Sequence, residues 1–195
     1  MRRRMPAVAA MIATALLLTG CSSDPLAEQY KEGSNKGYIA GDGSVTEIAE
    51  SERGESISFA GIADTGEEVS SEDFAGDVLV VNFWYAACAP CRAEAPLLQE
   101  LSVEYEGQNA QFIGVNVYDQ ADTAQSFNDT YGITYPSIMD VQDGAVKLAF
   151  TGSVPPKAVP TTLVLDKEGR VAARILGQVK EASILGTLIR DTIAE

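Results

Sequence analysis

The hydrophobic pattern of the chain predicts four strands between residues 78 and 176. Residues 78–84 (Val-Leu-Val-Val-Asn-Phe-Trp) form an almost continuous apolar run, and residues 111–117 form another. A strand that is covered on both faces is apolar along its length rather than at alternate positions. Two further strands are predicted at residues 161–166 and 170–176, with Lys167-Glu168-Gly169 as the hairpin turn between them.

Three helices are predicted between and after these strands. The first spans residues 90–105, with Pro90 in its first turn, where proline is favoured. The second spans residues 121–131 and ends at Gly132. The third spans residues 182–193 and is amphipathic. Its apolar stripe consists of Ile184, Leu185, Leu188 and Ile189. The order β-α-β-α-β-β-α predicts an α/β fold with a central sheet and helices on both faces.

The first 20 residues have the features of a signal peptide. Residues 1–4 are basic, and residues 7–18 are apolar and uncharged. This apolar stretch is shorter than the roughly 20 residues that span a bilayer. The sequence Leu-Thr-Gly-Cys at residues 18–21 resembles the bacterial lipobox, which implies cleavage before Cys21 and lipidation of that cysteine. An ordinary secretory signal or an uncleaved anchor are the alternatives.

A tether is predicted between the lipidated cysteine and the folded domain. Residues 21–55 are rich in Ser, Gly, Asp and Glu and show no helical or strand period. Such a segment is expected to be a flexible spacer that reaches on the order of 30 Å. Part of it could instead dock as an extra strand or hairpin at the edge of the domain. The folded domain is expected at residues 56–195.

Charge and composition exclude several classes of function. The formal net charge is −14, and removal of a leader with three arginines and no acidic residue would leave −17. So acidic a protein is not expected to bind nucleic acid. The chain contains no histidine, which excludes Ser–His triads, Cys–His proteases and most zinc or copper sites. We therefore expect neither a metal nor a nucleic-acid partner.

The two remaining cysteines, Cys88 and Cys91, form a Cys-x-x-Cys motif at the predicted start of a helix. The free amide groups and dipole at a helix N-terminus stabilise a thiolate, so Cys88 is the candidate nucleophile. Cys91 lies one turn deeper on the same face and is the candidate resolving thiol. Arg92 adds a neighbouring positive charge. The alternatives are half of a metal knuckle, for which further ligands are lacking, and an inert disulfide.

A resemblance to a known family rests on the residues around this motif. Residues 83–91 (Phe-Trp-Tyr-Ala-Ala-Cys-Ala-Pro-Cys) follow an apolar strand and resemble thioredoxin. With Asn82, Glu94 and Pro96, they look more like the TlpA/ResA-like branch of AhpC/TSA-redoxin type proteins, which are membrane-tethered extracytoplasmic thiol–disulfide oxidoreductases. The resemblance covers roughly residues 57–195. It implies a thioredoxin-like fold with a central mixed β-sheet.

Two further segments extend this resemblance. Residues 131–136 resemble an insertion of that branch, and residues 159–162 (Val-Pro-Thr-Thr) resemble its cis-proline segment. The resemblance implies a role for Glu94 in proton transfer to or from Cys91, against the alternative of an exposed helix glutamate. It also implies a set of substrate-binding residues: Trp84, Ala89, Pro90, Val159 and Pro160. Ala87 stands where most relatives carry tryptophan, so an aromatic lip of the substrate groove is lost.

The function that this resemblance implies is disulfide reduction outside the cytoplasm, with the Cys88–Cys91 pair in place of any other cofactor. Protein thiols or disulfides would be the substrates, apocytochrome c among them, and a membrane thiol electron-transfer protein would supply electrons. A disulfide-forming oxidase and a non-catalytic surface lipoprotein are the alternatives. A thiol peroxidase is a third alternative. It is disfavoured because Tyr85 stands where peroxiredoxins carry Thr or Ser. A copper chaperone is disfavoured by the lack of histidine.

Overall fold

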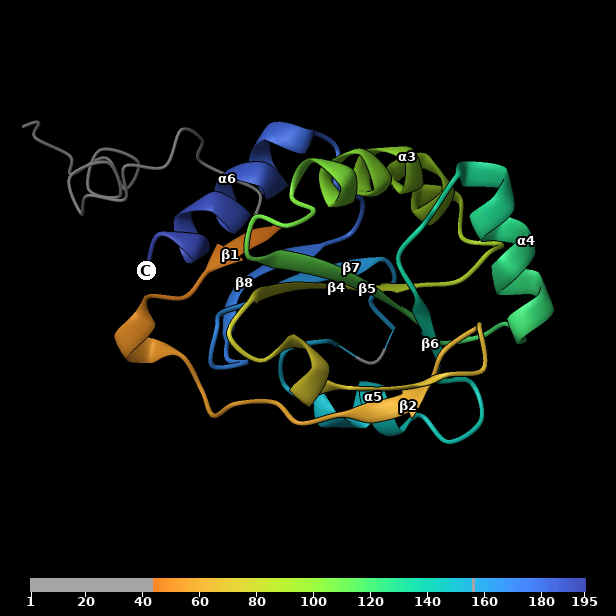
Figure 1. The fold of residues 1–195 in the computed structure, drawn as a ribbon, viewed down its shortest axis with the longest axis horizontal. Coiled ribbons are helices and arrows are strands. Elements are labelled where there is room, and N and C mark those ends of the chain that lie inside the picture. The colour runs from red at the N-terminus through yellow and green to blue at the C-terminus, as the bar shows by residue number, and fades with distance from the viewer. Residues whose placement is uncertain (1–43, 156) are drawn as a thin grey trace, which may run out of the picture. The chain divides into compact units, whose positions relative to one another are not determined.

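A six-stranded mixed sheet forms the centre of the protein in the computed structural model, which describes residues 44–155 and 157–195 (Figure 1). The strand order is β1-β8-β7-β4-β5-β6. The strands are β1 (Val45–Glu47), β4 (Val78–Trp84), β5 (Ala110–Asn116), β6 (Ser137–Met139), β7 (Thr161–Leu165) and β8 (Val171–Leu176). β4, β5 and β6 are parallel, whereas β7 is antiparallel to β4 and β8. The predicted leader, Cys21 and most of the predicted tether lie outside the described residues.

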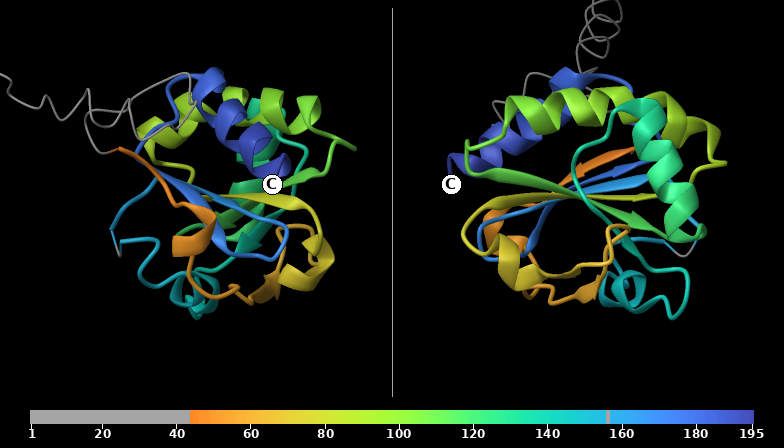
Figure 2. Two further views of the ribbon diagram at one scale, coloured as in Figure 1. Left: turned by 90° about the vertical axis from the view of Figure 1, so that its left-hand side faces the viewer. Right: turned by 45° about the vertical axis from the view of Figure 1, so that its right-hand side comes forward.

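Helices cover both faces of this sheet (Figures 1 and 2). On one face lie α3 (Ala89–Glu104) and α6 (Ala182–Ile193), and α4 (Ala121–Tyr131) lies beside α3 toward β6. The other face carries α5 (Ala145–Ala149) together with a small hairpin of β2 (Ala60–Ile62) and β3 (Glu68–Ser70). Two short 3-10 helices complete the described elements, η1 (Glu50–Glu52) and η2 (Ser71–Phe74). The α/β fold with a mixed sheet and helices on both faces is thus confirmed.

The central strand β4 explains the continuous apolar run in the sequence. Its alternate side chains Val78 and Val80 pack under α3 and α6. Leu79 and Val81 pack on the opposite face, against the core beneath α5. All seven residues of β4 are buried. Since both faces are covered, apolar side chains occupy every position of the strand except that of Asn82.

The bounds of the main elements agree closely with the sequence prediction. The strand predicted at residues 78–84 and the helices predicted at residues 121–131 and 182–193 have those ends, and the other four predicted elements shift by one residue at one end or both. The sequence pattern did not predict β2, β3, β6, α5 or the 3-10 helices η1 and η2. Each is five residues or shorter, so too few positions are available to show a period. None of the helices in the described part of the chain is long and apolar enough to cross a membrane.

The expected boundary between tether and domain was placed too late in the chain. Strand β1 pairs antiparallel with β8, with Val45 opposite Ile175. The side chain of Arg53 is only 3% exposed, and its guanidinium forms an ion pair with Asp166 at 2.9 Å. Residues 45–53 therefore pack on the domain, which is the edge-strand alternative rather than a flexible spacer. The pairing uses backbone groups along the free edge of β8, so a polar segment can join without an apolar run.

Candidate active site

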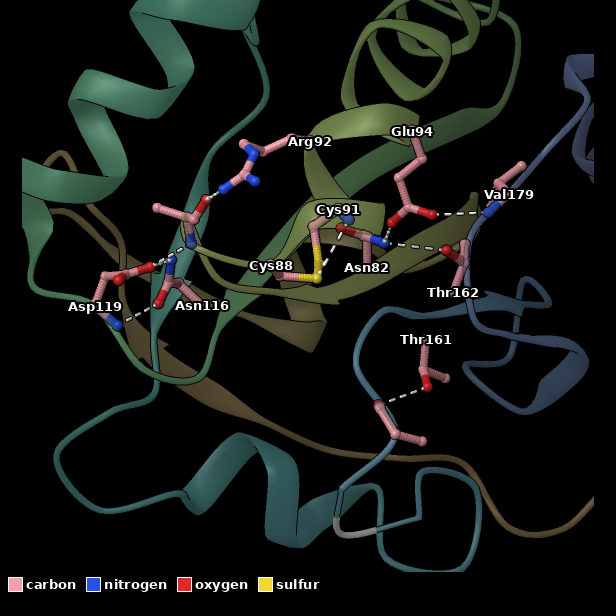
Figure 3. The surroundings of a disulfide bond; sticks show 12 residues. Asn82, Cys88, Cys91, Arg92, Glu94, Asn116, Asp119, Thr161, Thr162 and Val179 are labelled. Carbon is pink, nitrogen blue, oxygen red and sulfur yellow. Dashed lines mark hydrogen bonds between the residues drawn. A yellow bond between two sulfur atoms is a disulfide. The ribbon is translucent and has the colours of Figure 1, made fainter.

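The two cysteines of the motif form a disulfide at the N-terminus of α3 (Figure 3). Their sulfurs are 2.10 Å apart and their Cα atoms 5.2 Å apart. Cys88 is the N-cap residue of the helix, and its Sγ accepts a hydrogen bond of 3.3 Å from the backbone amide of Cys91. Free amides at a helix N-terminus favour a negative charge on the capping atom. The structure therefore places Cys88 where a thiolate would be stabilised.

The surface around the disulfide is made of small residues. Ala87, Ala89 and Pro90 are exposed, whereas Cys88 is 4% exposed and Cys91 is 2% exposed. The two predicted binding residues Ala89 and Pro90 thus lie at the surface beside Cys88. A substrate that approaches here meets little steric obstruction from the motif itself.

Glu94 is buried behind the disulfide, with an exposed fraction of 1%. Its Oε1 accepts a hydrogen bond of 2.9 Å from Nδ2 of Asn82, and its Oε2 accepts one of 2.8 Å from the backbone amide of Val179. The amide of Asn82 also donates to Oγ1 of Thr162 at 3.1 Å. In Figure 3 Asn82 lies between the disulfide and the carboxyl group. The alternative of an exposed helix glutamate is wrong.

Burial sets the proton affinity of this carboxyl group. Loss of water raises the pKa of Glu94 to about 7, although the hydrogen bonds from Val179 and Asn82 act to lower it. A carboxyl group with a pKa near neutrality holds its proton part of the time and can also accept one. Glu94 can therefore take up or release a proton near neutral pH.

A small cavity of about 10 Å³ lies behind Cys91, bounded by β4, α3 and α4. Its wall includes Trp84, which is 4% exposed. The indole Nε1 donates to Oγ of Ser137 at 3.2 Å, and the ring packs on Phe127 with centroids 4.4 Å apart. Trp84 thus supports the disulfide from the interior and lines no open surface, so the structure does not favour the substrate contact that the resemblance implied for it.

The segment before β7 completes the site on its other side. The peptide bond between Val159 and Pro160 is cis, as the resemblance implied. Pro160 is buried, whereas Val159 is partly buried and packs against the cluster that contains both cysteines. Of the five expected binding residues, Ala89, Pro90 and Val159 therefore lie at the surface around the disulfide.

Sequence reasoning missed the residues that hold the loop before Cys88. Oδ2 of Asp119 accepts a hydrogen bond of 2.6 Å from the backbone amide of Ala86. Nη1 of Arg92 donates to the carbonyl of the same residue at 3.3 Å, so this guanidinium contacts the loop backbone (Figure 3). Asn116 in turn donates to Asp119 at 3.0 Å. Polar residues just after β5 could have been expected near this loop, because β4 and β5 are parallel and their C-terminal ends meet at one edge of the sheet.

The described residues contain no group of three or more Cys, Asp or Glu side chains arranged to hold a metal ion. The site that they do form consists of a disulfide, a buried carboxyl group and a surface of small side chains. The disulfide of this site can accept two electrons and return them as it opens and closes.

Comparisons with known proteins agree with this geometry. The model of the AhpC/TSA family matches residues 54–174. The chain is 31% identical over 119 residues to the thiol-disulfide oxidoreductase ResA of Geobacillus thermodenitrificans, and the match covers 61% of this chain and 66%, just under two thirds, of that protein.

Two solved structures are similar over nearly their whole length. A DsbF homologue from Corynebacterium diphtheriae is 36% identical with a TM-score of 0.67, and the match covers 82% of this chain and 99% of that one. A secreted thiol-disulfide isomerase from Corynebacterium glutamicum is 29% identical with a TM-score of 0.69. That match covers 84% of this chain and 99% of the isomerase. This protein therefore belongs to the AhpC/TSA family, in the branch of thioredoxin-like thiol–disulfide oxidoreductases.

Proposed function

We propose that the protein is an extracytoplasmic disulfide reductase that uses Cys88 and Cys91 as its redox pair. The observation that carries this proposal is the disulfide at the N-terminus of α3 with a buried, protonatable carboxyl group behind it. No further cofactor is required, because the two sulfurs store both electrons.

The reaction starts from the reduced protein. The thiolate of Cys88 attacks one sulfur of a substrate disulfide, which breaks that bond and releases the first substrate sulfur as a thiolate. Cys91 then gives its proton to the carboxylate of Glu94 and attacks Sγ of Cys88. This step forms the Cys88–Cys91 disulfide and releases the second substrate sulfur. Two electrons pass to the substrate, and a dithiol protein must return two electrons to the chain for the next cycle.

The surroundings of Cys88 favour reduction over oxidation. A strongly oxidising pair requires a strongly stabilised thiolate in its reduced form. Here the two residues between the cysteines are Ala89 and Pro90, which have no polar side chain to add to the stabilisation that the helix N-terminus provides. The alternative of a disulfide-forming oxidase or isomerase draws support from the names of the two similar solved structures.

The reduction potential of the Cys88–Cys91 pair separates these two functions. A potential near that of thioredoxin, about −270 mV, would support the reductase, and one near −120 mV would refute it in favour of an oxidase. The pair can be equilibrated with glutathione or dithiothreitol buffers and quantified by thiol alkylation. A protein that neither reduces nor oxidises a dithiol probe would refute both functions.

A Cys91→Ser variant should identify the substrate. The variant retains the nucleophile Cys88 but lacks the thiol that resolves the mixed disulfide, so it should hold its partner covalently. Capture followed by mass spectrometry names that partner. Cys88→Ser is the matched control and should capture nothing at this site. We propose a protein disulfide as the substrate, with apocytochrome c as one candidate and a membrane thiol electron-transfer protein as the electron donor.

The proposed location outside the cytoplasm draws support from the leader-like residues 1–20 and from the secreted homologue among the similar structures. We propose a diacylglyceryl group on Cys21 as the anchor. Mass spectrometry of the N-terminal peptide from bacterial membranes should show this modification, and Cys21→Ser should release the protein from the membrane. A membrane-free wild-type protein with an unmodified Cys21 would refute the anchor while leaving the redox function intact.

A further inference from the structure

One large aromatic side chain stands exposed beside the loop that carries the nucleophile. Tyr118 follows β5, and 72% of its surface is exposed. Its ring packs against that of Tyr85, with centroids 5.7 Å apart. The carbonyl of Tyr85 accepts a hydrogen bond of 3.2 Å from the backbone amide of Cys88. The exposed ring is thus linked to the nucleophile through a single intervening residue.

The loop that presents this ring is fixed by hydrogen bonds. Oδ1 of Asn116 accepts hydrogen bonds from the backbone amides of Tyr118 at 3.1 Å and Asp119 at 2.8 Å. Asp119 in turn holds the amide of Ala86 at 2.6 Å (Figure 3). Because this backbone is already held, a partner that binds through Tyr118 need not order the loop as well.

The motif itself offers little surface for binding. Its exposed residues around the nucleophile are Ala87, Ala89 and Pro90. Small side chains cannot supply the large apolar contact area that usually carries binding energy. A tyrosine provides such area together with a polar tip, which suits a surface that alternates between a bound partner and water.

We propose that Tyr118, supported by Tyr85, is the specificity-determining residue of the substrate groove and packs against a large apolar or aromatic side chain next to the substrate cysteine. The bound partner is therefore a cysteine-bearing polypeptide, and the pair replaces the aromatic surface that Ala87 does not provide. This inference rests on the proposed thiol–disulfide exchange at Cys88.

Paired peptide substrates test the inference directly. Two disulfide-bonded peptides should be identical except for phenylalanine or glycine next to one cysteine. We measure kcat/KM for each peptide and for a small aromatic disulfide. The wild-type protein should prefer the phenylalanine peptide by roughly three- to tenfold, the range expected of one aromatic pair. Tyr118→Ala should abolish that preference, whereas Tyr118→Phe should preserve it because the ring is retained.

Val103→Ala is the matched control. Val103 is also an exposed apolar residue, 56% exposed, but it lies near the other end of α3, roughly 20 Å from the nucleophile at 1.5 Å per helical residue. This variant should keep the wild-type preference. Circular dichroism establishes that each variant is folded.

The outcomes separate this inference from the proposed function. A wild-type protein that reacts with neither the peptides nor the small disulfide would overturn the proposed function. A wild-type protein that reacts with all three but shows no preference, or a Tyr118→Ala variant that keeps the preference, would overturn the role of Tyr118 alone.

Discussion

Glu94 gives the stability of this protein a specific dependence on pH. Its carboxyl group has a pKa of about 7 in the folded chain, against an ordinary value of 4.5. Between these two pH values the unfolded chain releases the proton while the folded chain keeps it. The unfolded state then binds fewer protons, so the free energy of unfolding must fall as pH rises. This decrease in the free energy of unfolding is complete above pH 7, where the carboxyl group is ionised in the folded chain as well.

The size of this effect follows from the pKa difference. One unit corresponds to about 1.4 kcal/mol, so ionisation of Glu94 should cost the folded protein about 3 kcal/mol by pH 8. A Glu94→Gln variant cannot ionise and should not show this loss. Its side chain has one acceptor oxygen for the two donors Asn82 and Val179, so one hydrogen bond is lost at every pH, at about 1–3 kcal/mol.

Urea denaturation of the disulfide-bonded form measures the prediction without interference from free thiols. The free energy of unfolding should be determined for the wild type and for Glu94→Gln between pH 4.5 and 8. The wild type should be the more stable protein at pH 4.5, and its advantage should shrink by about 3 kcal/mol at pH 8. Glu100→Gln serves as the control, because Glu100 is exposed on the same helix and should give a nearly constant difference.

A constant difference between wild type and Glu94→Gln across this range would refute the raised pKa. In the reduced protein the same variant also tests the proton transfer. A carboxylate that exchanges a proton with Cys91 would also disfavour its thiolate, so Glu94→Gln should shift the thiol titration of the reduced protein. An unchanged thiol titration would remove Glu94 from the mechanism even if its effect on stability were confirmed.

Two further substitutions test the packing that supports the site. Arg53→Met should lower the free energy of unfolding in urea by about 1.5–3 kcal/mol, the range for one hydrogen bond between charged groups. It removes the bond from Arg53 to Asp166, whereas Arg170 stays paired with that carboxylate at 2.9 Å. A loss below about 1 kcal/mol would show that residues 45–53 contribute little. Gly114→Ala should cost about 1–3 kcal/mol, because the new Cβ would overlap Oγ of Ser137 and lie 2.7 Å from Nε1 of Trp84. The single tryptophan makes its fluorescence a direct readout, and an unchanged spectrum and stability would contradict the close packing.

The sequence determined the core of the fold and the redox pair because both depend on local patterns. A strand buried on both faces needs an apolar run such as residues 78–84, and a helix that packs on one face needs an apolar stripe such as that of residues 182–193. The Cys-x-x-Cys spacing placed the two cysteines one helical turn apart, within reach of a disulfide. Each of these features involves residues close together in the chain, so each was visible without a structure.

Tertiary structure decided which side chains surround the disulfide. Glu94 is buried only because Asn82 on β4 and Val179 after β8 enclose it from distant parts of the chain. Tyr118 stands beside the nucleophile only because β5 pairs in parallel with β4. Burial, pKa and access depend on the packing of segments that are far apart in the sequence, and a local pattern does not contain that information.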